Sequence, residues 1–163
     1  MEIVTTPEGA KTWKLDILKD SIFDNVSTRT GYLNQRRAIE DRDDKHVLMD
    51  DDRGIFEKHF NGAIAKLVMM LGRGFSTELT ANSLDAAGAH FEFSAGENNK
   101  DSISFSLDFY CQEFVTVFIL SKWFDYEAEG MGINNELEEA ETNIRSASRY
   151  QKHTIQRPIH PIF

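Results

Sequence analysis

Carboxylates are the side chains in this sequence from which a metal site or an acid–base pair could be built. The aspartates gather in two groups, Asp41, Asp43 and Asp44, then Asp50, Asp51 and Asp52. A calcium loop needs oxygen ligands at positions 1, 3 and 5, a glycine at 6 and a glutamate at 12. Counted from Asp50, position 5 is Gly54 and the first glutamate falls at position 8, so the pattern fails. We interpret the second group as the cap of a helix, because a short acidic side chain accepts hydrogen bonds from the first amides of a helix.

The five histidines and the single cysteine also lack the spacing of a chemical site. The histidines are His46, His59, His90, His153 and His160, and no two of them have the spacing of zinc ligands. Cys111 begins a strongly apolar stretch, where a thiol is more often a small core side chain than a nucleophile. We therefore expect no enzymatic activity, no metal and no cofactor.

The charge of the chain is unevenly divided. The 163 residues carry a net charge of −9, but residues 143–163 hold four basic side chains and no acidic one. The remainder has 14 basic and 27 acidic residues, a net charge of −13. An acidic body argues against wrapping nucleic acid. No apolar run reaches the length of a membrane helix, and the N-terminus does not read as a secretory signal, so we expect no membrane association.

Hydrophobic spacing predicts two helices in the first half of the chain. Apolar residues from about Thr12 into the thirties repeat at helical spacing, and the pattern weakens at residues 27–31. The polar stretch 34–54 reads as a surface loop. A second helix follows from Phe56 to Leu71 and ends at Gly72-Arg-Gly74. Gly62 inside this helix suggests a close helix crossing.

The second half predicts a β-hairpin and two more helices. Strict alternation at residues 90–93 and 102–107, around a turn-forming cluster, predicts a hairpin near 89–107. A helix from Phe109 to Phe124 is apolar on most of its circumference, which is typical of a bundle centre or a subunit contact. Its candidates for core or subunit contact are Phe114, Phe118, Trp123 and Phe124. The last helix begins near Asn134 and carries a narrow stripe: Ile133, Leu137, Ala140, Ile144 and Ala147.

These elements predict a mainly α fold, a bundle of about four helices with one inserted β-hairpin and an extended C-terminal tail. Residues 1–152 form the helical domain and residues 153–163 the basic tail, whose two prolines cannot continue a helix. The tail is either a frayed terminus or an arm that docks on another subunit, and its apolar side chains favour the arm. The candidate arm residues are Arg149, Lys152, Ile155, Arg157, Pro158, Ile159, Pro161, Ile162 and Phe163.

This layout resembles the head-to-tail connector (adaptor or ring) proteins of tailed bacteriophages, including the crAss-like phages of Bacteroidales. Three stretches carry the resemblance. They are Ile17-Leu-Lys-Asp-Ser-Ile-Phe-Asp-Asn-Val26 with Thr28-Arg-Thr-Gly-Tyr32, then Asp51-Asp-Arg-Gly-Ile-Phe-Glu-Lys-His-Phe60, and Ser104-Phe-Ser-Leu-Asp-Phe109 running into Phe118-Ile-Leu-Ser-Lys-Trp-Phe124. The similarity covers nearly the whole chain in layout, with no diagnostic motif.

The resemblance implies a virion protein, assembled in the host bacterial cytoplasm as a ring that commonly has twelve copies. Such a ring sits between the portal protein and the next tail or ring protein and continues the DNA channel. DNA passes through its lumen without specific binding, which an acidic body would favour. Two other classes stay open: a small acidic cytoplasmic interaction or inhibitor protein with no virion role, and a helical enzyme whose acidic residues bind a divalent metal.

Overall fold

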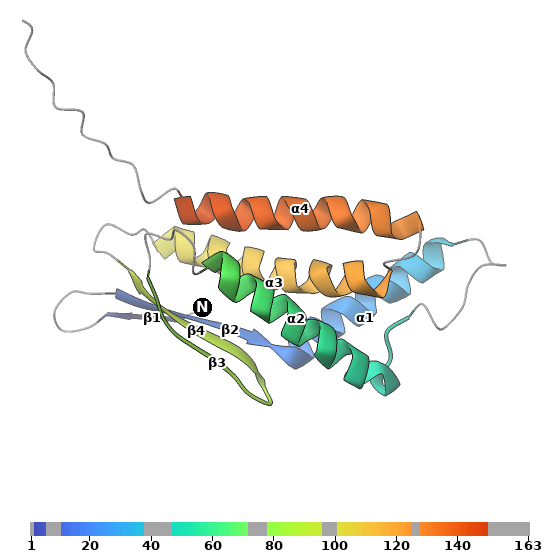
Figure 1. Ribbon diagram of the computed structural model, residues 1–163, viewed down its shortest axis with the longest axis horizontal. Coiled ribbons are helices and arrows are strands. Elements are labelled where there is room, and N and C mark those ends of the chain that lie inside the picture. Colours follow the sequence, from blue (N-terminus) through green and yellow to red (C-terminus); the bar gives the residue numbers. More distant parts are fainter. Residues whose placement is uncertain are drawn as a thin grey trace, which may run out of the picture.

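The computed structural model describes residues 2–5, 11–37, 47–71, 78–95, 101–124 and 128–149 (Figure 1). In chain order it contains strands β1 (Glu2–Thr5) and β2 (Lys11–Leu18), helix α1 (Lys19–Arg36), a short 3₁₀ helix η3 (Asp50–Asp52), helix α2 (Arg53–Leu71), strands β3 (Glu78–Leu84) and β4 (Gly88–Ala95), and helices α3 (Asp101–Trp123) and α4 (Ala128–Arg149). These residues are mostly helical, with four α-helices beside a small antiparallel sheet, so the mainly α expectation is confirmed. None of these helices is long and apolar enough to cross a membrane.

The sheet is built from two hairpins joined at their inner strands. Its order is β1-β2-β4-β3, and all neighbours are antiparallel. Alternate residues point to the helices and are fully or almost fully buried: Trp13, Leu15 and Ile17 of β2, and Ala89, Phe91 and Phe93 of β4. At Gly88 a Cβ atom would lie 2.2 Å from the carbonyl oxygen of Ile17. Only glycine therefore lets β4 begin this close to β2.

Helix α3 occupies the centre of the molecule. Figure 1 shows the helices on one side of the sheet, with α2 crossing α3 and α4 running alongside it. Helix α3 contacts α1, α2, α4 and β2. Its buried residues lie around most of its circumference: Leu107, Cys111, Phe114, Val115, Thr116, Val117, Ile119, Leu120 and Ser121. The expectation of a central apolar helix is confirmed.

The predicted helix beginning near Thr12 is wrong at its start, because residues 11–18 form strand β2. The buried side chains Trp13, Leu15 and Ile17 are spaced by two, as in a strand with one buried face. Residues 13, 17, 18 and 22 also fit a helical spacing, and the eight residues of β2 are too few to separate the two periods. Strand β1, at residues 2–5, likewise has no counterpart among the predicted elements.

The hairpin predicted at 89–107 is also wrong. Residues 90–93 do lie in β4, but its partners are β2 and β3, and residues 102–107 begin helix α3. Leu107 lies on one helical stripe with Cys111 and Phe114, and all three are buried, whereas the alternating Phe105 is 61% exposed. The β3–β4 turn is closed by Asp85, whose carboxylate accepts hydrogen bonds from the amides of Ala87 and Gly88. This is the behaviour of an aspartate at the start of a turn.

Helix α1 continues through residues 27–31, where the sequence pattern weakens. The polar side chains of Ser27 and Thr30 bind the backbone of the segment that leads into α2. The Ser27 hydroxyl donates to the carbonyl of Leu48 at 2.8 Å, and the amide of Leu48 donates to the Thr30 hydroxyl at 3.0 Å. The expected polar loop 34–54 thus contains the end of α1, the buried Leu48 and η3. Its aspartates act partly as predicted, since the Asp52 carboxylate accepts from the amide of Met49.

Two phenylalanines of α3, one buried and one exposed, allow the energetic contribution of core packing to be tested. Phe114 is fully buried, whereas Phe109 is 64% exposed. We predict that Phe114→Ala lowers the free energy of unfolding by about 3–5 kcal/mol, because it leaves a cavity among packed side chains. Phe109→Ala should change it by no more than about 0.5 kcal/mol. Urea denaturation of both variants checks this, and equal losses would contradict the central place of Phe114.

Gly62 of α2 lies against α3 with room for a larger side chain. A Cβ atom there would lie 3.7 Å from the ring of Phe118, an ordinary van der Waals distance. The close crossing suggested by the sequence therefore does not require glycine. We predict that Gly62→Ala raises the free energy of unfolding by about 0.5–1 kcal/mol, because alanine favours the helix. A lower midpoint in urea denaturation would show that the crossing tolerates no added methyl group.

Candidate docking surfaces

The structure divides the predicted contact residues between core and surface. Phe114 and Phe124 are buried in the core, and Phe118 and Trp123 are half-buried beside it. Arg149 is the last residue of α4. The remaining arm residues lie outside the described part of the chain: Lys152, Ile155, Arg157, Pro158, Ile159, Pro161, Ile162 and Phe163.

The described residues do not assemble a nucleophile or a metal site. Burial raises the pKa of the Cys111 thiol far above its ordinary value, with a smaller contribution from Asp108. A thiol that stays protonated inside the core is not a nucleophile. Among these residues no group of three or more His, Cys, Asp and Glu side chains is placed to hold a metal ion. Asp41, Asp43 and Asp44 lie outside the described part of the chain.

One hollow, which we call the acidic hollow, lies between α1, α3 and α4. It has a volume of about 510 Å³ and is lined by Arg29, Phe109, Tyr110, Glu113, Glu136, Glu139, Ala140 and Asn143. Arg29 donates from Nη2 to Glu113 at 2.7 Å, and its Nη1 lies 3.9 Å from Glu136. One guanidinium therefore faces three carboxylates, and the hollow keeps a net negative charge. Such a site favours a cationic partner.

Exposed aromatic side chains border the acidic hollow. Phe109 lines it and is 64% exposed, and Phe105, one turn earlier on α3, is 61% exposed. Large apolar side chains clustered at a charged hollow are typical of an interaction surface. We call the acidic hollow together with Phe105 and Phe109 the acidic face.

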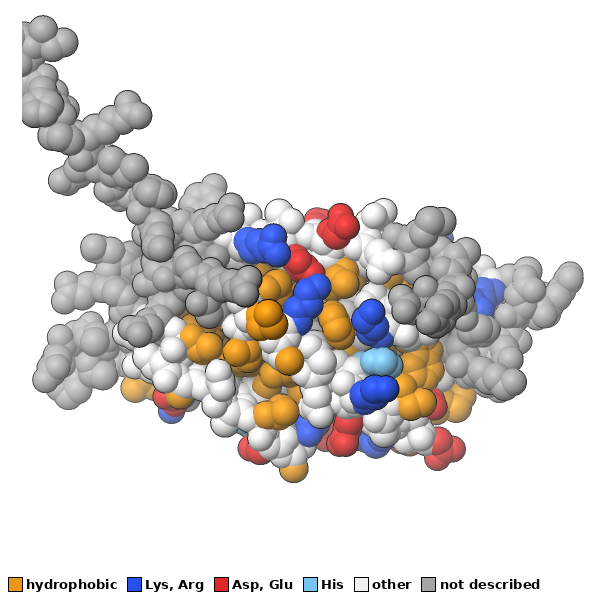
Figure 2. All heavy atoms as spheres, in the orientation of Figure 1, with side chains coloured by type: hydrophobic (Ala, Val, Ile, Leu, Met, Phe, Trp, Pro, Cys, Tyr) orange, Lys and Arg blue, Asp and Glu red, His pale blue; other side chains and the backbone are white. Residues whose placement is uncertain are grey.

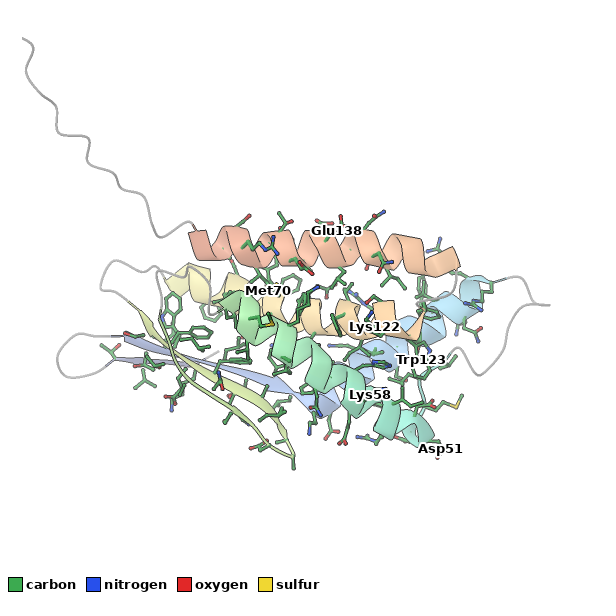
Figure 3. The ribbon with its side chains drawn as sticks, in the orientation of Figure 1. Asp51, Lys58, Met70, Lys122, Trp123 and Glu138 are labelled. Atoms are coloured by element: carbon green, nitrogen blue, oxygen red, sulfur yellow. The ribbon has the colours of Figure 1, made fainter. Side chains whose placement is uncertain are left out.

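A second surface, the basic face, runs over α2 and the C-terminal half of α3. Figure 2 views this face, where basic side chains and a histidine lie among apolar side chains, and Figure 3 labels Lys58 on α2 and Lys122 on α3. We define the basic face by Ile55, Lys58, His59, Met69 and Lys122. Ile55 and Met69 are 51% and 59% exposed. Lys58 and Lys122 make no ion pair among the described residues.

The shift in the pKa of His59 is consistent with a positive charge on the basic face. Its pKa is lowered, first by burial and then by the charges of Lys58 and Lys122. Both charged groups that act on this imidazole are cations. Lys66, nearby on α2, is instead neutralised by an ion pair with Glu141. The uncompensated positive charge of this face is therefore concentrated at Lys58 and Lys122.

The acidic and basic faces lie on opposite sides of α3. Phe109 and Phe118 are nine residues apart on this helix, and so are Glu113 and Lys122. Nine residues make about two and a half turns of an α-helix, so their side chains point in opposite directions. Lys122 and Lys66 both lie within 6 Å of the Phe118 ring, which places Phe118 beside the basic face, while Phe109 lines the acidic hollow. The molecule thus presents opposite charges to two sides.

Sequence reasoning missed both faces. The glutamates of α4 have the pattern of a solvated helix surface, and nothing in the sequence distinguishes Lys58 or Lys122 from other exposed lysines. One signal was available: α2 keeps apolar residues on both sides, since Ile55 and Met69 are exposed while Phe56 and Leu67 are buried. A helix apolar beyond its buried face indicates a second contact.

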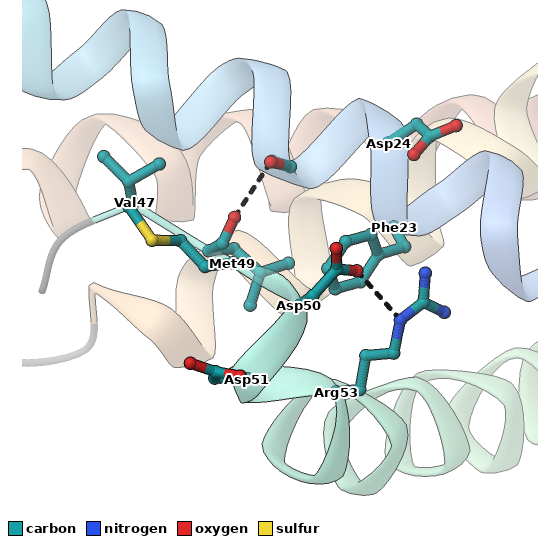
Figure 4. A pocket seen from close by; sticks show the side chains of 9 residues that line it. Phe23, Asp24, Val47, Met49, Asp50, Asp51 and Arg53 are labelled. Carbon is teal, nitrogen blue, oxygen red and sulfur yellow. Dashed lines mark hydrogen bonds and ion pairs between the residues drawn. The ribbon is translucent and has the colours of Figure 1, made fainter. Parts of the chain in front are cut away.

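A further open pocket lies between α1 and the segment leading to α2 (Figure 4). It measures about 660 Å³ and is lined by Phe23, Asp24, Ser27, Val47, Leu48, Met49, Asp50, Asp51 and Arg53. Arg53 closes it by pairing with Asp20 and Asp50, while its guanidinium lies over the ring of Phe23 at 4.5 Å. These contacts join α1 to the start of α2, and we interpret the pocket as a structural seam.

Comparison of the chain with protein-family models, curated proteins and solved structures finds no match.

A histidine on the open side of the sheet makes stability depend on pH. His90 Nδ1 lies 2.7 Å from Asp16 and Nε2 lies 3.3 Å from Asp85, so the imidazolium can donate to a carboxylate on each side. The hydrogen bond to Asp16, and then the one to Asp85, raise the pKa of His90 above its ordinary 6.5. Because the pKa of His90 is higher in the folded than in the unfolded protein, its protonation stabilises the fold. This stabilisation is complete when the pH is below the pKa of the unfolded state, and it is lost as the pH rises through the pKa of the folded state.

We therefore predict that His90→Gln lowers the melting temperature most at about pH 5–6, and progressively less toward about pH 9. Measurements should stay above the ordinary pKa of Asp85, 3.8. The pKa of Asp85 is itself lowered, first by the amide of Gly88, so its own contribution is lost only in more acidic solution. If the melting temperatures of wild type and variant differ by the same amount at every pH in this range, the predicted role of His90 is contradicted.

Proposed function

We propose that this protein is a non-enzymatic structural subunit of a tailed-phage virion. Copies assemble as a ring between the portal and the next tail protein, and the C-terminal arm docks on a neighbour. DNA passes through the lumen of the ring. The resemblance of residues 17–32, 51–60 and 104–124 to head-to-tail connectors supports this proposal.

The division of charge along the chain carries the proposal. The last 21 residues carry +4 and the rest of the chain −13. Of the four basic residues, Arg145 and Arg149 lie in the last turns of α4, and Lys152 and Arg157 follow it. A lumen through which DNA slides must not hold phosphate, and acidic walls repel it. A basic tail with apolar side chains is suited instead to an acidic protein surface. One chain therefore combines a body that lets DNA pass with an arm that holds a partner.

The exposed side chains of the body support an assembly role. Phe105, Phe109, Ile55 and Met69 are each more than half exposed. A subunit that works alone gains nothing from exposing several large apolar side chains beside charged groups. In an assembly such side chains are buried against neighbouring copies or partners.

One observation favours an alternative, a small acidic interaction or inhibitor protein. Glu113, Glu136 and Glu139 surround a hollow that could receive a basic side chain of a foreign partner. Such a protein would remain a monomer or dimer, so the oligomeric state separates the two functions.

The test is the mass of the full-length protein in solution, alone and with a portal protein encoded near its gene. We expect closed rings of uniform stoichiometry by mass photometry, alone or once the portal is present. A protein that stays monomeric under both conditions would overturn the ring proposal, and binding of a basic protein by that monomer would support the inhibitor alternative.

We predict that deleting residues 153–163 weakens assembly and leaves the body folded. The removed segment contains two prolines and no helical period, so its loss should not disturb the packed core. The melting temperature of the truncated subunit should match that of the full-length subunit under conditions where both are monomeric. Unchanged assembly of the truncated protein would remove the docking role of the arm.

A further inference from the structure

We propose that adjacent copies of this chain join head to tail, with the basic face of one copy seated on the acidic face of the next. Lys58 and Lys122 of one subunit then lie against Glu136 and Glu139 of its neighbour. This inference rests on the proposed ring and names the lateral contact that would build it.

Charge complementarity selects a second copy as the occupant. The acidic hollow holds three carboxylates and one guanidinium, and its Glu139 makes no ion pair within the described parts of the chain. On the basic face, Lys58 and Lys122 also make no ion pair there, and no carboxylate contributes to the shift of the His59 pKa. Each face therefore carries the charge that the other needs.

Apolar complementarity adds to the charge. The acidic face exposes Phe105 and Phe109, and the basic face exposes Ile55 and Met69. Methionine side chains pack well on aromatic rings, and an ammonium group is attracted to the face of an aromatic ring. Contact between the two faces would bury apolar side chains at its centre and pair charges around them, as stable interfaces do.

The placement of the faces determines the symmetry. A two-fold dimer joins one surface patch to the same patch of its partner, and two faces on opposite sides of α3 cannot both lie in one patch, so such a dimer would set acid against acid or base against base. Because the faces point to opposite sides of α3, contact between unlike faces leaves one free face on each end copy. Head-to-tail addition gives a ring where the rotation between copies closes, and an open filament where it does not. The same geometry therefore disfavours a symmetric dimer and is the one that a ring requires.

Charge reversal provides the experiment. In the acid-reversed variant, Glu136→Lys and Glu139→Lys, the hollow repels the lysines of every neighbour. In the base-reversed variant, Lys58→Glu and Lys122→Glu, the basic face repels every hollow. We expect each variant alone to assemble at least tenfold more weakly than wild type by mass photometry, under the condition in which wild type assembles.

An equimolar mixture of the two variants separates the proposal from simple damage. Each variant then offers the charge that the other has come to need, so assembly should return with the variants alternating. Native mass spectrometry should find equal numbers of each in every particle. All four reversals combined in one chain should also restore assembly.

The matched control uses an exposed residue away from both faces. Glu138 lies on α4 but points away from Glu136 and Glu139, because residues one or two positions apart on a helix face different ways. Glu138→Lys should leave assembly unchanged. Thermal unfolding of every variant confirms that each remains folded, since all of the substituted side chains are exposed.

The outcomes distinguish this contact from the ring itself. Wild type that never assembles overturns the proposed function. Wild type that assembles, together with reversal variants that assemble as well, overturns the contact and leaves the ring. Weak assembly of the acid-reversed variant alone, with the base-reversed variant unaffected, would show that the hollow receives another basic segment such as the C-terminal arm, and would also overturn the contact. Failure of the mixture to assemble does the same.

Discussion

The burial of α3 is the constraint on which the rest of the structure depends. This helix contacts the sheet through β2 and packs against the other three α-helices, so most of its circumference lies in the core. Where two neighbours leave a gap, its side chains reach the surface. One gap exposes Phe105 and Phe109, and another leaves Phe118 half-buried beside Lys122. The periodicity of one helix therefore places the acidic and basic faces on opposite sides of the molecule.

Two polar arrangements hold the elements around α3 in place. The hydroxyls of Ser27 and Thr30 satisfy both the carbonyl and the amide of the buried Leu48, which holds the segment before α2 against α1. A buried peptide group without such partners would destabilise the fold, so these hydroxyls matter more than their weak helix propensity suggests. On the open side of the sheet, His90 connects Asp16 of β2 to Asp85 at the β3–β4 turn. These two contacts join segments that are distant in sequence.

The sequence predicts the helices better than the strands, for a physical reason. Helix α2 follows from the long repeat that includes Phe56, Phe60 and Leu71, because a core-facing helical stripe of about four turns fits no other structure. Residues 11–18 and 102–107 are too short to distinguish a period of two from a period of 3.6, and tertiary packing decides between them. For the same reason the sequence hints at a second contact on α2 but does not place the two faces. Phe109 and Phe114 are identical side chains on one helix, and only the arrangement of α1 and α4 leaves the first exposed and the second buried.

Positive and negative charges are separated in two ways within the net charge of −9. The first runs along the chain, between an acidic body and a basic tail. The second runs across the body, between the lysines on one side of α3 and the glutamates on the other. A surface of uniform negative charge would repel every copy of itself and every DNA phosphate alike. A body that is acidic overall but has a basic face can repel DNA and still attract its own acidic face. Since solvent-exposed charges act over only about 8–10 Å in physiological salt, the lysines need not weaken the repulsion of DNA elsewhere on the surface. The charge pattern of the chain is therefore compatible both with the proposed self-association and with the proposed passive DNA channel.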